Sequence, residues 1–171
     1  QNLTESVVIC GGEPTLHENL LQWCKYIKSL GFRVKLDTNG TNPKILKELI
    51  ENKLIDFISI DYKAPIDKYK QITQKKLNTL RFFFSIKFIV NSGIDYEFRT
   101  TIHSEFLTFK DIKQMILELK EFGVKNYFLQ NFLENTKTIT DIKTSNKFKS
   151  QNKELLNELK YNFEKFGIRN N

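Results

Sequence analysis

Short apolar runs alternate along the chain with longer segments in which apolar residues recur every three or four positions. The short runs contain β-branched or aromatic residues, which favour strands. They cover residues 6–10, 33–37, 57–61, 96–102 and 126–132. Strands that alternate with helices form parallel sheets or barrels. The pattern therefore predicts an α/β fold of parallel βα units, in which the segments between the strands are helices.

The connection before the fourth strand is the most ambiguous of these segments. Residues 78–93 contain three consecutive phenylalanines with β-branched neighbours, so the segment could be a buried strand. We expect a helix, because a parallel strand at 96–102 needs a crossover before it. The other helices have clearer signals. The first has an apolar face from Leu20 to Leu30 and is ended by Gly31, and the second has Pro43 at its opening turn. The helix before the fifth strand has apolar residues at helical spacing from Phe109 to Leu119.

The last forty residues divide into two parts. Residues 134–152 are polar and lack an apolar period, which predicts a loop. Residues 153–167 predict a C-terminal helix whose apolar stripe is formed by Leu155, Leu159, Phe163 and Phe166. A chain of 171 residues can bury a core without disulfides or a structural metal. We therefore expect a single domain.

Polar residues gather at the carboxyl ends of the predicted strands, and these ends share one edge of a parallel sheet where ligands bind. They are Gly11, Gly12, Glu13, Asp37, Thr38, Asp61, Lys63, Arg99 and Gln130. The paired glycines let a ligand approach the strand end, and Glu13 can accept hydrogen bonds from an ammonium group. Gly-Gly-Glu-Pro alone would indicate only a turn. Its place between a strand and an amphipathic helix favours a site for an amino-acid moiety.

Four segments together resemble a known family. VVICGGEPTLH is similar to the segment with which radical S-adenosylmethionine (SAM) enzymes hold the methionyl amine of SAM. KLDTNGTNP, IDFISIDYKAP and YEFRTTIHSEFLTFKDI follow in the order seen in activating enzymes of glycyl-radical enzymes. The resemblance covers about residues 6–132 and is strongest to the anaerobic ribonucleotide reductase activator type, a relative of the pyruvate formate-lyase activating enzyme. It implies most of a partial TIM-like barrel.

The resemblance implies a role for each of the polar residues. Gly11, Gly12 and Glu13 would bind the methionyl part of SAM, Asp37 and Thr38 would lie near its ribose or carboxylate edge, Lys63 and Arg99 would face its carboxylate or the substrate, and Gln130 would line the adenine side. Asp37 and Asp61 would also help to hold a monovalent cation. Structural alternatives remain open, because Asp37 could be a turn residue, Asp61 and Lys63 could only pair, and Arg99 could pair with Asp61 or Glu97.

The family chemistry also needs a 4Fe-4S cluster held by a CxxxCxxC loop. This sequence has only Cys10 and Cys24, 14 positions apart, and we expect both to be buried structural thiols. The resemblance places the cluster loop before the first strand seen here, so we expect a truncated chain that is inactive alone. His17 and His103 are expected in surface or capping roles. No catalytic residue and no metal ligand is assigned.

For the intact protein the resemblance implies reductive cleavage of SAM and formation of a glycyl radical on an anaerobic reductase. A flavodoxin- or ferredoxin-like protein would supply the electron. The alternatives are a radical SAM enzyme that acts on another peptide or a small molecule, and a cluster-free binding or scaffold module of the same fold. Upstream coding sequence would discriminate between them.

Charge and hydropathy change this picture little. The net charge of +7 comes from lysines scattered over the predicted helices, which indicates solvated faces, and no nucleic-acid-binding motif is visible. We therefore do not expect nucleic acid as a partner. The longest apolar stretch, residues 80–90, is interrupted by Arg81 and Lys87 and is too short to span a bilayer. With no secretory signal, a cytoplasmic location is expected.

Overall fold

The computed structural model of the chain describes residues 5–74, 76–132 and 152–169. The strands follow one another in the order β1-β2-β3-β4-β5-β6, and every strand pairing with a described register is parallel. The strands are β1 (Ser6–Ile9), β2 (Arg33–Thr38), β3 (Phe57–Asp61), β4 (Asp95–Ile102), β5 (Asn126–Asn131) and β6 (Lys165–Arg169). The helices are α1 (Leu20–Ser29), α2 (Pro43–Glu51), α3 (Tyr69–Thr73), α4 (Thr79–Asn91), α5 (Phe109–Glu121) and α6 (Asn152–Asn162), with a short 3-10 helix at Pro14–Leu16. The predicted parallel α/β class is confirmed.

The chain forms two compact units. The first comprises residues 1–61 and 77–97, and the second comprises residues 62–76 and 98–171. Each unit is built from two separate stretches of chain, and strand β4 begins in the first and ends in the second. A single domain therefore stays a prediction.

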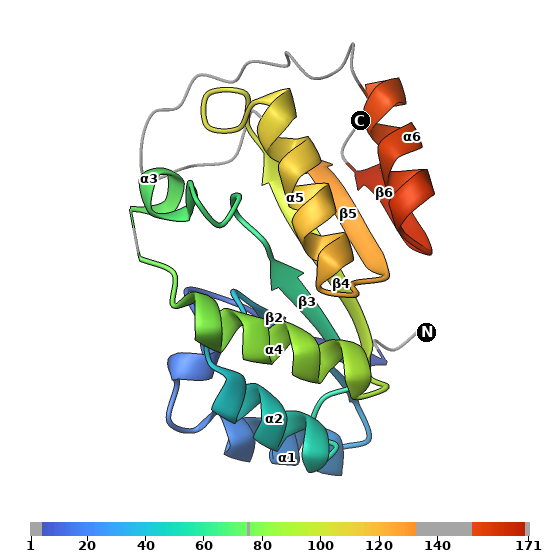
Figure 1. Cartoon of the computed structure of the whole chain (residues 1–171). Coiled ribbons are helices and arrows are strands. Elements are labelled where there is room, and N and C mark those ends of the chain that lie inside the picture. Colours follow the sequence, from blue (N-terminus) through green and yellow to red (C-terminus); the bar gives the residue numbers. More distant parts are fainter. Residues whose placement is uncertain (1–4, 75, 133–151, 170–171) are drawn as a thin grey trace. The chain divides into compact units, whose positions relative to one another are not determined.

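The first unit holds β1, β2 and β3 with helices α1, α2 and α4 (Figure 1). Alternate residues of the strands point to opposite faces. Leu36 and Ile58 are paired in register and completely buried, and the next residues along, Asp37 and Ser59, are paired on the other face. One face is therefore apolar and packed, whereas the other carries polar groups.

The ambiguous segment with three phenylalanines is helix α4, as predicted. Phe82, Ile86 and Ile89 are buried, whereas Phe84 is 61% exposed, so the segment has one packed face of helical period. At 13 residues α4 is shorter than a membrane span. Within the described residues no helix combines the length and the hydropathy needed to cross a membrane.

The second unit holds the end of β4, β5, β6 and helices α5 and α6 (Figure 1). Its core includes Phe98, Met115 and Leu129. The buried hydroxyl of Thr100 donates a 2.6 Å hydrogen bond to the Tyr62 carbonyl and lies 2.7 Å from the Tyr127 hydroxyl. This contact joins the segment after β3 to β4 and β5.

The predicted C-terminal helix over 153–167 is wrong in its last five residues, 163–167. Helix α6 ends at Asn162, and strand β6 follows and pairs in parallel with β5. Phe166 lies opposite Tyr127 in that pairing and belongs to no helical stripe. The backbone hydrogen-bonding groups of residues 165–169 pair with those of strand β5. Such pairing with a distant strand leaves no periodic pattern in the local sequence. The predicted loop at 134–152 lies outside the described residues, apart from Asn152, which begins α6.

Candidate functional site

The two glycines that follow β1 leave the strand end open. Gly11 has φ +138°, a backbone conformation that residues with a side chain rarely adopt. The φ of Gly12 does not lie in this region. A Cβ atom built at either position would meet no atom within 4 Å. Both residues are exposed. The backbone of this loop is therefore unobstructed, and ligand binding there stays a prediction.

Glu13 ties this loop to the end of β2. Its Oε1 accepts hydrogen bonds from the Thr15 amide (3.1 Å), the Thr15 hydroxyl and the Thr38 hydroxyl (2.6 Å). Its Oε2 accepts one from the Asn39 amide at 2.8 Å. Oε1 accepts three of the four hydrogen bonds and Oε2 accepts one, so Oε2 is the less engaged oxygen. Glu13 thus holds two strand ends together, and its Oε2 is the atom that a further donor would approach.

The turn after β2 packs tightly. Gly40 has φ +72°, and a Cβ there would lie 3.0 Å from the Phe82 ring and 3.3 Å from the Ile60 side chain, so only glycine fits. The Asn39 side chain accepts from the Thr41 amide at 2.9 Å. Asn39 and Gly40 therefore form the turn. Asp37 lies before it, within β2.

The polar face of the first unit contains a charged group that the sequence reasoning missed. The Lys35 Nζ lies 3.5 Å from the Asp37 Oδ1 and 3.8 Å from the Glu97 Oε1. The Ser59 hydroxyl donates to the same Glu97 oxygen at 2.6 Å. Alternation along the strands was the available signal, because Lys35 precedes Asp37 by two residues as Ser59 precedes Asp61. Asp61 ends β3 on this face.

Three predicted site residues belong to the second unit. Lys63 is exposed after β3, Arg99 is half-buried in β4, and Gln130 is half-buried in β5 opposite Thr101. The structure brings together the first-unit residues Gly11, Gly12, Glu13 and Thr38 by the contacts above, with Asp37 next in the strand. That the second-unit residues share a site with them stays a prediction.

One expectation for the cysteines and histidines is wrong. Cys24 is buried as expected, and its burial raises the thiol pKa to about 11. Cys10, which was expected to be buried, is exposed directly after β1. His17 is exposed and accepts from the Asn19 amide, as expected for a cap. His103 also caps its turn, through the Glu105 amide, but the ring is 7% exposed and packs against Phe106 and Phe132.

These thiols do not supply a cluster site. A cluster with three protein ligands needs three thiolates, and the sequence has two cysteines. Among the described residues, no group of three His, Cys, Asp or Glu side chains could hold a metal ion. The residues of the chain therefore do not fit the cluster, and binding of the amino-acid end of SAM at the glycine loop stays a prediction.

The Radical SAM superfamily model matches residues 1–130. The chain belongs to the radical SAM superfamily. SAM and a 4Fe-4S cluster are the cofactors of that family. A Methanocaldococcus jannaschii protein provisionally named a glycyl-radical enzyme activating enzyme is 35% identical over 133 residues, which cover 75% of this chain and 55% of that protein. The chain spans about half the length of the curated relatives it matches.

Solved structures share the fold. A domain of the pyruvate-formate lyase-activating enzyme from Bacteroides vulgatus superposes with a TM-score of 0.74 at 18% identity, covering 96% of this chain and 99% of that domain. Streptococcus suis SuiB bound to S-adenosylmethionine gives 0.73 at 16% identity, covering 96% of this chain and 39% of SuiB. The predicted class, a partial TIM-like radical SAM fold, is confirmed.

Proposed function

We propose that this chain is the SAM-binding part of an activating enzyme that generates a glycyl radical on an anaerobic ribonucleotide reductase-like partner. The observation that carries the proposal is the open glycine loop, together with a Glu13 carboxylate whose Oε2 accepts a single hydrogen bond. Superfamily membership supports the cofactor, and the names of the two curated relatives support the activating role. When bound, SAM and the reduced cluster supply the radical chemistry, and the residues of this chain position SAM.

In this proposal Gly11 and Gly12 admit the methionyl end of SAM, and its ammonium group donates to Glu13. The Thr38 hydroxyl already donates to Glu13, so Thr38 acts by orienting that carboxylate. Asp37 faces the ribose or carboxylate edge. The resemblance also places a monovalent cation at Asp37 and Asp61. The Lys35 ammonium group already lies beside Asp37 and would compete with such a cation.

The resemblance also assigns roles to three residues of the second unit. Lys63 and Arg99 would supply positive charge toward the SAM carboxylate or the substrate, and Gln130 would line the adenine side. The cluster ligands and the contact with a flavodoxin- or ferredoxin-like reductant would come from sequence outside these 171 residues. Action on another peptide is the second candidate, because a structure of SuiB with the same fold carries its precursor peptide SuiA.

Gly12→Val tests the proposal without disturbing the fold. Gly12 lacks a positive φ and a Cβ there meets nothing, so valine should leave the melting temperature unchanged and obstruct only an approaching ligand. We expect SAM binding to the full-length protein, measured by calorimetry, to weaken by about tenfold or more, on the scale of one lost charge-assisted hydrogen bond.

Gly167→Ala is the matched control, because its Cβ would make an ordinary 3.4 Å contact with the Phe128 ring in the second unit. Unchanged SAM affinity in the Gly12 variant would remove the loop from the site. The partner is tested separately, by mixing the reduced full-length protein with an anaerobic reductase and recording the glycyl radical by electron paramagnetic resonance. Cleavage of SAM without that signal would favour the peptide or small-molecule alternative.

A further inference from the structure

The polar face of the first unit contains a buried negative charge. Glu97 is 5% exposed, and a carboxylate so far from water is unfavourable unless it is paired and hydrogen-bonded. Ser59 supplies the hydrogen bond, and Lys35 supplies the positive charge. Glu97 therefore fixes where the ammonium group of Lys35 lies.

Lys35 lies between this buried carboxylate and Asp37. Alternate residues of a strand share a face and stand about 6.6 Å apart, a span that the long lysine side chain covers. The ammonium group comes within 3.5 Å of the Asp37 carboxylate. The Asp37 side chain is 16% exposed and that of Lys35 is 30% exposed, so solvent screens this pair only in part.

We infer that Lys35, held by Glu97, is a built-in counter-ion that positions Asp37, so that no monovalent metal cation is needed at that carboxylate. The inference rests on the proposed function, which places Asp37 beside SAM. The resemblance implies a monovalent cation at Asp37 and Asp61, whereas the structure places an ammonium group against Asp37. Two cations compete for the charge of one carboxylate, so the tethered ammonium weakens the binding of a free ion there.

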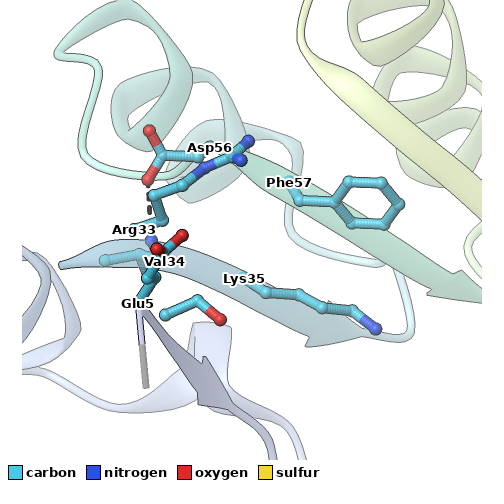
Figure 2. Close-up of a pocket in the computed structure, with 7 residues that line it drawn as sticks. Glu5, Arg33, Val34, Lys35, Asp56 and Phe57 are labelled. Carbon is cyan, nitrogen blue, oxygen red and sulfur yellow. Dashed lines mark hydrogen bonds between the residues drawn. The ribbon is translucent and has the colours of Figure 1, made fainter. Parts of the chain in front are cut away.

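A cavity beside Lys35 makes the inference testable by chemical rescue. The cavity has a volume of about 240 Å³ and lies at the amino ends of β1, β2 and β3. It is lined by Glu5, Ser6, Arg33, Val34, Lys35, Asp56 and Phe57 (Figure 2). The Lys35 side chain runs beside Phe57, with Nζ 5.5 Å from the ring centroid. Lys35→Ala would extend this cavity toward Asp37, and n-propylammonium, which replaces the atoms removed, could enter it.

The experiment titrates SAM into the anaerobically reconstituted full-length protein without reductant, so that binding is measured without turnover. Titrations are run in tetramethylammonium, sodium and potassium salts. We expect the wild-type affinity to agree within about twofold in all three, since the counter-ion is internal. Lys35→Ala should bind about tenfold more weakly in tetramethylammonium salt and recover with potassium or n-propylammonium. Lys35→Arg should behave like the wild type.

Lys47→Ala is the matched control, because Lys47 is a 58% exposed lysine of the same unit that pairs with Glu51 on its own helix. Glu97→Gln should weaken SAM binding in the wild type and add nothing in the Lys35→Ala background, because it acts through Lys35.

Two outcomes would overturn the inference: a wild-type protein that binds SAM only with potassium or sodium, or a Lys35→Ala variant whose weaker binding neither ion nor amine restores. The second result, accompanied by a lower melting temperature, would assign Lys35 a structural role alone. If no variant binds SAM in any salt, the proposed function fails and this inference falls with it. SAM binding with the wrong salt dependence overturns only the inference.

Discussion

Glu13 shows how one residue can serve the fold and a ligand together. The sequence pattern predicts that its carboxylate receives an ammonium group, and the structure shows it receiving four hydrogen bonds from Thr15, Thr38 and Asn39. Three of them reach Oε1. The crowded oxygen holds the loop in place, and the less engaged Oε2 remains for the ligand. A change at this position will therefore affect stability as well as binding.

We expect Glu13→Gln to lower the free energy of unfolding by about 1–3 kcal/mol, because the amide nitrogen cannot accept and would leave at least one of these donors unsatisfied. Urea denaturation of both proteins at neutral pH measures the difference. Glu18→Gln, at an exposed position five residues further along, should change stability little and serves as the control. Equal stability of the Glu13 variant would show that its hydrogen bonds make no net contribution to the fold.

The contact between Lys35 and Glu97 could not be predicted from the sequence, for a physical reason. Lys35 and Glu97 lie 62 positions apart, and their contact exists only because β2, β3 and β4 are folded into their places. The motif residues Gly11, Gly12 and Glu13, in contrast, carry their signal in consecutive letters. Local motifs could be predicted, whereas a charge network across strands required the structure.

At the scale of elements, helix α5 illustrates a strong local signal supported by a distant residue. Thr108 and Asp111 form a reciprocal capping box in which the Asp111 Oδ2 accepts from the Thr108 amide at 2.9 Å and from its hydroxyl at 2.7 Å. The Lys68 ammonium donates to the Asp111 Oδ1 at 2.6 Å. Burial acts to raise the pKa of Asp111, but the hydrogen bonds from Lys68 and Thr108 outweigh it and hold the pKa below its usual value.

A lowered pKa in the folded state means that the charged carboxylate stabilises the fold above the unfolded pKa of about 3.9, and that this contribution is lost as the pH falls through the folded value. We expect Asp111→Asn to reduce the free energy of unfolding by about 1–3 kcal/mol at pH 7. The difference from the wild type should shrink as the pH falls below about 3.9, because the unfolded carboxylate then takes up a proton and the folded one follows only at lower pH.

Urea denaturation at several pH values measures this, with Glu121→Gln at the exposed end of the same helix as the control. A difference that stays constant down to pH 3 would show that the charge of Asp111 does not contribute.

The C-terminal elements show where local pattern fails. Leu155, Leu159 and Phe163 are buried and follow a helical period, and Phe166 continues the spacing by chance. Gly167 lies beside the Phe128 ring of β5, and residues 165–169 complete the pairing of that strand. The end of α6 is thus decided by a partner strand some forty residues earlier. The bounds of β1 to β5 were predicted to within one residue, because short runs with β-branched or aromatic residues mark these strands locally.

At the scale of the whole molecule, the predicted βα order is confirmed, but the two compact units could not be predicted. Strand β4 contributes Glu97 to the first unit and Arg99 to the second, and nothing in the sequence marks a boundary between them. The candidate site residues divide in the same way. The strongest evidence for the site lies in the first unit, where the contacts of Glu13 and Lys35 are described.

Cluster assembly can be tested on the whole chain, because the cluster needs thiolate ligands that SAM does not need. Cys10 is exposed, whereas the pKa of Cys24 is raised to about 11, so that Cys24 stays a protonated thiol at neutral pH and is a poor metal ligand. We expect the 171-residue chain, reconstituted anaerobically with iron and sulfide, to keep no more iron after desalting than its Cys10→Ala, Cys24→Ala variant. The full-length protein should assemble a cluster under the same conditions. Iron analysis and electron paramagnetic resonance measure both. A cluster signal from the 171-residue chain that responds to SAM and disappears in the double variant would show that these two thiols, with other ligands, suffice after all.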